Sequence, residues 1–202
     1  MVGVAGIMGG GKSTVARVFE ELGALRVDAD GIGKSLLQEK EIRNRLVDIF
    51  GEGILGPEGR ISAVKLGEAA FSDRERAGKL NQVTGEPLVS RIRERIRELV
   101  HKAEVIVVDA ALLPEWGAHK WLDYLLVVDS DEEACVERIV KNSRFTEAEV
   151  RARMACQFPR QEKARYADRI IVNDGSEAEL VEKARRAYEE VLRLRKRSDT
   201  NG

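Results

Sequence analysis

Short apolar runs alternate along this chain with longer segments in which apolar residues recur every three or four positions. The runs are rich in β-branched residues and predict five buried strands, at residues 2–7, 25–28, 105–109, 125–129 and 169–172. A helix is expected from Lys12 to about Leu22, where Gly23 ends it. Strands that are apolar on both faces need helices on both sides, so the alternation favours an α/β fold with a parallel sheet and right-handed crossovers.

Two long segments interrupt this rhythm. Residues 31–103 contain no convincing strand and show only helical patterns, at residues 42–50, 64–71, 74–83 and 88–100. Such an insertion in an α/β core predicts a substrate-binding subdomain, although the same helices would also serve to cover the sheet. The second segment, residues 141–167, is rich in cations: Arg144, Arg151, Arg153, Arg160, Lys163 and Arg165. These are either a solvated helix face or movable cations that close over phosphates.

The loop after the first predicted strand carries a recognisable chemistry. Residues 6–13, Gly-Ile-Met-Gly-Gly-Gly-Lys-Ser, fit the pattern G-x-x-x-x-G-K-[ST] between a strand and a helix. Glycines let backbone N–H groups turn inward around a phosphate chain, and the helix that follows adds its positive end. Lys12 is expected on the β- and γ-phosphates and the hydroxyl of Ser13 on Mg²⁺. The predicted nucleotide site comprises Gly9, Gly10, Gly11, Lys12, Ser13 and Thr14.

Aspartates follow several of the predicted strands. Asp28 and Asp30 are two residues apart, so in an extended strand end both carboxylates would point into one cleft. There they would accept a proton from an attacking hydroxyl or organise Mg²⁺. Helix capping explains one of the two, not both. Asp109 ends an apolar strand as a metal-binding aspartate does, but Asp129 ends its strand in the same way, so the predicted metal role of Asp109 has an alternative.

Composition narrows the classes of function. Lys and Arg total 34 and Asp and Glu 35, and a net charge of −1 argues against nucleic acid or an anionic membrane as partner. No apolar run reaches the ~18 residues of a membrane span, and the apolar N-terminus lacks a basic leader, so a cytoplasmic protein is expected. Cys135 and Cys156 lack metal-ligand spacing and are expected to be small buried side chains. Disorder is expected only in the charged tail, residues 193–202.

These motifs together resemble the dephospho-CoA kinase family over about residues 1–190. The likeness rests on residues 6–14, on Asp-Ala-Asp at 28–30, and on shorter matches at Leu22-Gly23, Phe71-Ser72-Asp73, Leu80-Asn81, Leu112-Leu113, Val127-Val128-Asp129, Glu137-Arg138, Gln157, Arg160, Ala167-Asp168 and Asn173-Asp174-Gly175-Ser176. The chain departs from the family where His-Pro-Leu is usual, since it has Gly85-Glu86-Pro87-Leu88. Further departures are Ala111 for proline, Asn142 for an arginine that Arg144 follows two residues on, and Lys163 where arginine is common. These changes touch the acceptor and lid regions.

The resemblance implies a three-layer P-loop kinase fold with a five-stranded parallel sheet. It implies a single domain with a core of residues 1–30, 104–140 and 168–195, a helical acceptor-binding subdomain of residues 31–103, and a helical lid of residues 141–167. The implied reaction is ATP- and Mg²⁺-dependent phosphorylation of the ribose 3′-hydroxyl of dephospho-CoA, the last step of coenzyme A biosynthesis.

The resemblance also implies roles for individual residues. Asp30 would be the base and Asp28 would lie beside it on the substrate. Arg138, Arg160 and Lys163 would lie near phosphates, and the turn at Asn173 and Gly175 would meet the adenine of ATP. A kinase for another nucleotide or nucleoside, and a non-catalytic nucleotide-binding switch, are the alternatives. The switch is disfavoured because the chain has no Asn-Lys-x-Asp guanine-reading motif and has an arginine-rich lid.

Overall fold

The computed structural model describes the backbone of residues 1–143 and 145–200, and side chains as far as residue 197. Its centre is a five-stranded parallel sheet with the order β2-β3-β1-β4-β5. The strands are β1 (Val2–Gly6), β2 (Leu25–Asp28), β3 (Ile106–Asp109), β4 (Tyr124–Asp129) and β5 (Arg169–Val172). They lie where the apolar runs predicted them, so the α/β fold with a parallel sheet is confirmed.

The register of the strands brings the candidate residues to one edge of the sheet. Asp28 of β2 lies opposite Asp109 of β3, and Gly6 at the end of β1 lies opposite Val128 of β4. Because all five strands are parallel, their carboxyl ends share an edge, which is where open α/β sheets bind ligands. The loop after Gly6 and the aspartates after the other strands therefore converge there.

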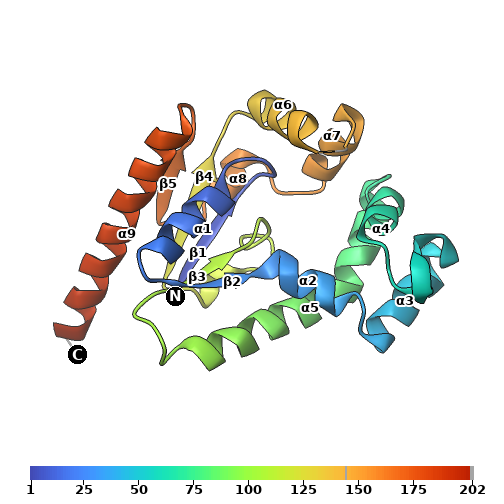
Figure 1. Ribbon diagram of the computed structural model, residues 1–202, viewed down its shortest axis with the longest axis horizontal. Helices are drawn as coiled ribbons and strands as arrows, with labels where there is room; N and C mark the ends of the chain where they lie inside the picture. Colours follow the sequence, from blue (N-terminus) through green and yellow to red (C-terminus); the bar gives the residue numbers. More distant parts are fainter. Residues whose placement is uncertain (144, 201–202) are drawn as a thin grey trace.

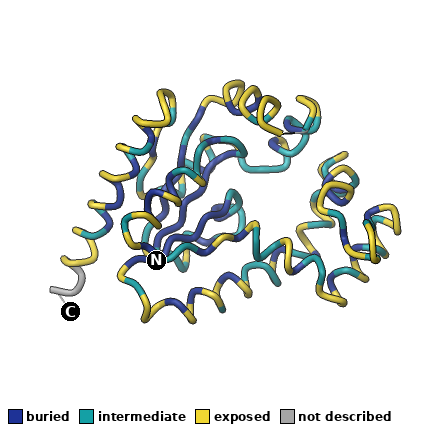
Figure 2. The backbone as a smooth tube through the Cα atoms, viewed as in Figure 1, coloured by how far each residue is buried: buried dark blue, intermediate teal, exposed yellow. Residues whose placement is uncertain are grey.

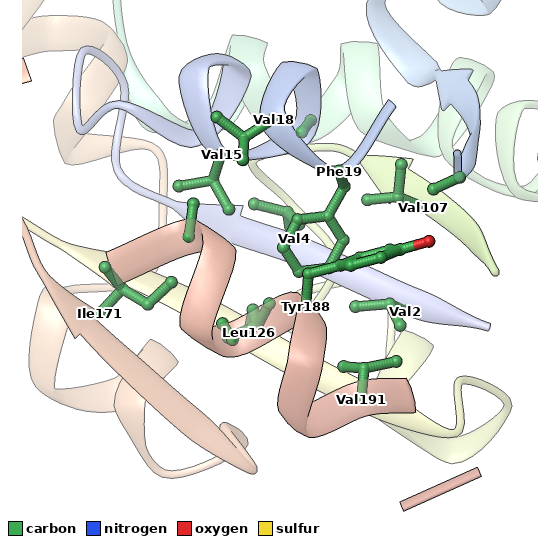
Figure 3. Close-up of a cluster of buried hydrophobic side chains, with 14 of the residues drawn as sticks. Val2, Val4, Val15, Val18, Phe19, Val107, Leu126, Ile171, Tyr188 and Val191 are labelled. Carbon is green, nitrogen blue, oxygen red and sulfur yellow. The ribbon is translucent and has the colours of Figure 1, made fainter. Parts of the chain in front are cut away.

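Helices cover both faces of the sheet and give three layers (Figure 1). On one face, α1 (Lys12–Glu21) and α9 (Glu177–Thr200) pack against β1 and β4. Figure 3 shows the ring of Tyr188 edge-on to that of Phe19, with centroids 5.1 Å apart, over Val4. The predicted tail disorder is wrong as far as Thr200, because arginine and lysine favour helix and the buried Val191 anchors this end of α9.

The insertion folds around an apolar cluster of its own. It contains α2 (Ala29–Leu36), α3 (Lys40–Phe50), the 3₁₀ turns η1 (Glu52–Ile54) and η2 (Pro57–Gly59), and α4 (Ala63–Ala70). Leu46, Ile54 and Leu66 lie at the centre of this cluster, and the helices project away from the sheet (Figures 1 and 2). The insertion therefore does more than cover the sheet.

One continuous helix replaces two predicted ones. We expected helices at 74–83 and 88–100, but α5 (Arg74–Leu99) runs through Pro87 without a break. Proline has no N–H to donate to the previous turn, and that costs a helical hydrogen bond. Both halves of α5 are nevertheless packed, since Val83 belongs to the insertion cluster and Ile92 to the cluster under the sheet. Packing at both ends outweighs the lost bond.

The remaining helices are η3 (Ala118–Lys120), α6 (Glu132–Asn142), α7 (Glu147–Ala155) and α8 (Arg160–Ala164). Residues of α6 and α7 pack against Ile7 and Met8 in the loop that follows β1. Cys135 is fully buried beside Ile7, as expected, whereas Cys156 is only half-buried; both are free thiols. Arg144 lies outside the described residues. In the part of the chain that the structure describes, no helix is both long and apolar enough to span a bilayer.

Candidate active site

The loop between β1 and α1 leaves the first N–H groups of α1 without a capping side chain. Gly11 is the N-cap residue, with φ 95°, and makes no side-chain cap. A Cβ at this position would lie 2.7 Å from Nδ2 of Asn173 and 2.9 Å from Leu180, in a conformation that L-residues rarely adopt. Uncapped N–H groups at the positive end of a helix attract anions. The local geometry thus agrees with the predicted phosphate loop.

Three side chains donate hydrogen bonds to carbonyl groups of this loop. The hydroxyl of Ser130 donates to the Gly10 carbonyl over 2.9 Å, and Nδ2 of Asn173 donates to the same oxygen over 3.0 Å. The guanidinium of Arg138 donates to the Gly9 carbonyl. In a trans peptide the N–H points away from the C=O. The N–H that shares a peptide with the Gly9 carbonyl belongs to Gly10 and donates to the Ile7 carbonyl over 3.1 Å. Fixing the Gly10 carbonyl outward turns the Gly11 N–H toward the phosphate position.

Two of these contacts were not predicted from the sequence. The turn at Asn173 and Gly175 was expected at the adenine, and the structure adds a contact between the Asn173 side chain and the phosphate loop. Ser130 is 2% exposed and was missed; its only signal is its place directly after the strand-ending Asp129. Gly175 lies in the same turn, where a Cβ would be 2.0 Å from Glu179 and would displace the carboxylate that caps α9.

Asp109 and Asp129, which end β3 and β4, are each paired with an arginine. Oδ2 of Asp109, a residue 6% exposed, lies 2.6 Å from the Arg26 guanidinium on β2. Asp129 accepts two hydrogen bonds from Arg160 at the start of α8, over 2.6 and 2.8 Å. These bonds raise the pKa of Arg160. The bidentate pair ties the predicted lid to the sheet edge.

A magnesium site would depend mainly on the nucleotide. Among the described residues no group of three or more His, Cys, Asp and Glu side chains is placed to hold a metal. Of the two predicted ligands, Ser13 is an exposed hydroxyl at the start of α1, and Asp109 has one oxygen in its salt bridge. Mg²⁺ is commonly held by one or two protein oxygens together with phosphates and water, so this sparse set suits a metal that arrives with ATP.

Asp28 and Asp30 do not share an extended strand end. β2 ends at Asp28 and α2 begins at Ala29, so the predicted parallel orientation of the two carboxylates is wrong. Oδ1 of Asp28 accepts the N–H of Asp30 over 3.0 Å and caps α2, which turns the chain away from the strand direction. Asp30 lies in the first turn of α2 with its side chain exposed. Capping thus accounts for one aspartate and leaves the other free.

Asp30 lines a cavity of about 370 Å³ between the insertion and the loop after β3. Its wall includes Thr84, Leu88, Ala111, Trp116 and Gln157. Leu88, the last residue of the stretch in which the sequence departs from the family, is part of this wall, as is Thr84 just before that stretch. The lining of the cavity combines aliphatic and aromatic side chains with a few polar ones, which suits a mostly organic ligand with a few polar groups.

Lys163 does not have the position predicted for it. We expected a lid cation near phosphates, but the side chain is 0% exposed and donates to the Ala111 carbonyl over 2.7 Å and to the Glu115 carboxylate. Burial lowers the pKa of Lys163, Glu115 opposes this effect, and the charge of Lys12 lowers that pKa further. A buried lysine needs such a partner, and here the pair joins α8 to the loop after β3.

The chain is similar to known proteins over almost its whole length. A family model described as dephospho-CoA kinase matches residues 1–179. Dephospho-CoA kinases of Aquifex aeolicus and Thermobifida fusca are 37% and 36% identical to it over 193 and 196 residues, covering 95% of this chain and 97% and 96% of theirs. The solved structure of TT1252 from Thermus thermophilus, 30% identical, gives a TM-score of 0.74 with 96% of both chains covered. A dephospho-CoA kinase from Campylobacter jejuni, 26% identical, gives 0.68 with 94% and 96% covered.

Proposed function

This chain belongs to the dephospho-CoA kinase family, and we propose that it transfers the γ-phosphoryl group of ATP to the ribose 3′-hydroxyl of dephospho-CoA, yielding CoA and ADP. One observation supports this best. The uncapped N-terminus of α1 follows β1, and the cavity is lined by Asp30 after β2 and by Ala111 after β3. Both lie at the same edge of the sheet, so donor and acceptor have separate places at one site. Phosphoryl transfer needs this arrangement, because its catalysis is mostly positioning and charge stabilisation.

Asp30 acts as the base. The ribose 3′-oxygen forms a bond to the γ-phosphorus, and the bond from that phosphorus to the β,γ-bridging oxygen breaks, so that ADP leaves with the electron pair. The proton of the hydroxyl passes to the Asp30 carboxylate, which accepts no hydrogen bond from any side chain that the structure describes. Asp28 supports this step by capping the turn that carries Asp30.

Cations around the phosphate loop offset the charge that develops during transfer. Lys12 meets the β- and γ-phosphates, Arg138 stands beside Gly9, and Arg160 reaches the phosphate by leaving Asp129. Gly9, Gly10, Gly11 and Thr14 surround the phosphates, and the turn at Asn173 and Gly175 meets the adenine. Mg²⁺ would be held by Ser13 and by the Asp109 oxygen that Arg26 leaves free, and it would neutralise phosphate charge.

The proposal is tested by acceptor-dependent ADP formation. The protein is supplied with Mg²⁺-ATP and with dephospho-CoA, AMP, CMP or no acceptor, and products are identified by mass spectrometry. We expect turnover with dephospho-CoA to exceed that with either nucleotide by orders of magnitude, and CoA to be the product. Equal turnover with AMP or CMP would point to a different nucleotide kinase. Turnover that no acceptor stimulates would contradict a kinase.

A further inference from the structure

Arg153 on α7 is a cation whose hydrogen-bond donors are unused. Its side chain is half-buried, its Nε is fully buried, and none of the described residues accepts a hydrogen bond from the guanidinium. Instead the guanidinium lies over two aromatic rings, 4.8 Å from the centroid of Phe71 and 4.4 Å from that of Phe145. Cation–π contacts of this kind fix a guanidinium in place without using its N–H groups.

The two rings come from different parts of the fold. Phe71 follows α4 in the insertion, whereas Phe145 precedes α7 in the predicted lid. Gly67 on α4 is equally close, because a Cβ there would lie 2.6 and 2.8 Å from the two terminal nitrogens of Arg153. Arg74 at the start of α5 also donates to the carbonyl of Ala155 over 3.3 Å. Arg153 is therefore held at a seam between α7 and the insertion.

This seam adjoins the acceptor cavity. Gly67 and Phe71, which contact Arg153 directly, also line the 370 Å³ cavity that Asp30 lines. The cations of the phosphate loop belong to other elements: Lys12 begins α1, and Arg138 on α6 is bonded to Gly9. Arg153 thus lies next to the acceptor side of the site, behind two residues of the cavity wall.

The chemistry of Arg153 suits an oxyanion. Stacking occupies the faces of a guanidinium and leaves its in-plane N–H donors for a bidentate acceptor such as phosphate. Glu149 and Glu68 are the carboxylates near enough to affect it, but Glu149 is hydrogen-bonded to Thr146 in a capping box. Burial is the larger influence and lowers the pKa of Arg153. A half-buried guanidinium without a bonded anion has donors available for one.

We propose that Arg153 binds the diphosphate group of the acceptor and is a specificity-determining residue of this enzyme. The inference rests on the proposed function, because dephospho-CoA is the substrate that carries a diphosphate beside its reactive ribose. Arg153 on α7 would bind this group only while α7 and the insertion lie side by side. Phe71, Phe145 and Gly67 hold them in that arrangement.

The test compares dephospho-CoA with adenosine, which keeps the 3′-hydroxyl but lacks the 5′-diphosphate and the pantetheine arm attached to it. In Arg153→Met, kcat/KM for dephospho-CoA should fall roughly 10- to 100-fold, the range for hydrogen bonds to a charged group. The value for adenosine and the KM for ATP should stay within about twofold. Arg153→Lys should recover only part of the loss, because lysine lacks the planar fork. The matched control is Arg151→Met, two residues away on α7, whose partners are the exposed Glu133 and Glu147.

Other outcomes would overturn the inference. Equal losses for dephospho-CoA and adenosine would mean that Arg153 only joins α7 to the insertion. A loss confined to the KM for ATP would assign it to the donor. If wild-type turnover of adenosine is too slow to follow, the dissociation constants of both acceptors, measured by calorimetry, give the same comparison. Wild-type protein that does not phosphorylate dephospho-CoA contradicts the proposed function itself, and that result is obtained before any variant is made.

Discussion

The phosphate loop and the acceptor cavity are built in opposite ways. The loop's shape comes from backbone conformation, with Gly11 in a left-handed conformation and the carbonyl of Gly10 fixed by two side chains. The cavity is enclosed by side chains from segments far apart in the chain, such as Trp116 after β3 and Leu88 on α5. One region is a local motif, and the other is a product of tertiary packing.

This difference in construction predicts which region tolerates substitutions. A backbone cradle tolerates few substitutions, because an added Cβ at Gly9 or Gly11 would lie under 3.0 Å from neighbouring side chains. A wall of side chains tolerates more, and Leu88, the last residue of the stretch 85–88 in which the sequence departs from the family pattern, lies on this wall. We therefore expect variants in the loop to affect ATP, and variants in the wall or seam to affect the acceptor.

The largest effect is expected from Lys12→Ala. Activity should fall below a few per cent, because the lysine supplies a charge to the phosphates that no neutral side chain replaces. ATP should also lose its stabilising effect on the melting temperature, since a ligand raises stability only by binding the native state. Steady-state kinetics and melting curves with and without ATP measure both. Lys79→Ala, which removes an exposed lysine paired with Glu75, is the control and should behave as wild type.

Asp30→Asn should lower kcat by roughly 10² to 10⁴, the usual contribution of a general base. ATP affinity should change little, because Asp30 lines the acceptor cavity and not the loop. The matched variant is Asp28→Asn, which keeps a capping side chain and so should retain both stability and turnover. Normal activity in Asp30→Asn together with an inactive Asp28→Asn would reverse the two assignments.

The sequence predicted the fold well because the fold depends on local patterns. All five strands lie within one residue of the expected bounds at either end, since each is a compact apolar run covered on both faces. The error at Pro87 has the same origin. A proline disfavours helix locally, and only contacts made at both ends of α5, outside any local window, keep the helix continuous.

The site was predictable only where its residues act through the backbone. Ser130 and Gly10 are 120 residues apart in sequence, and no pattern joins them. The sequence does not distinguish a lysine that is a solvated lid cation from one that is a buried partner of Glu115. The burial of Lys163 in the structure decides for the second. Asp28 and Asp30 differ in role because β2 ends at Asp28 and α2 begins at Ala29, so the chain changes direction between them.

Lys163→Met tests the buried pair. The substitution fills a similar volume but leaves Glu115, 12% exposed, without its cation, so we expect a loss of about 3 to 5 kcal/mol in the free energy of unfolding. Urea denaturation measures it. Combining Lys163→Met with Glu115→Leu should recover much of the loss, since replacing both members of a buried pair is often close to neutral. A variant as stable as wild type, with reduced kcat, would restore Lys163 to the lid chemistry.

Arg160→Ala should lower kcat roughly 10²-fold, because a cation that meets the phosphate in the closed site stabilises the transition state more than the ground state. It should also lower the melting temperature slightly, since Asp129 loses both of its hydrogen bonds. Asp129→Asn weakens the same salt bridge while keeping the arginine, and it should lower stability with a much smaller effect on kcat. Equal effects on kcat in the two variants would show that Arg160 acts only by holding Asp129.

Ser130→Ala gives the smallest expected effect, and it tests whether the phosphate loop acts separately from the acceptor cavity. The hydroxyl donates to the Gly10 carbonyl, which keeps its second bond from Asn173, so the loss should be about 0.5 to 1.5 kcal/mol. Because that carbonyl orients the phosphate loop, the loss should appear as a several-fold higher KM for ATP, with the KM for dephospho-CoA unchanged. Ser72→Ala, which removes an exposed hydroxyl bonded to the Ala69 carbonyl in the insertion, is the control. An increase in the acceptor KM instead would mean that the phosphate loop and the acceptor cavity are coupled through the sheet edge and do not act as separate regions.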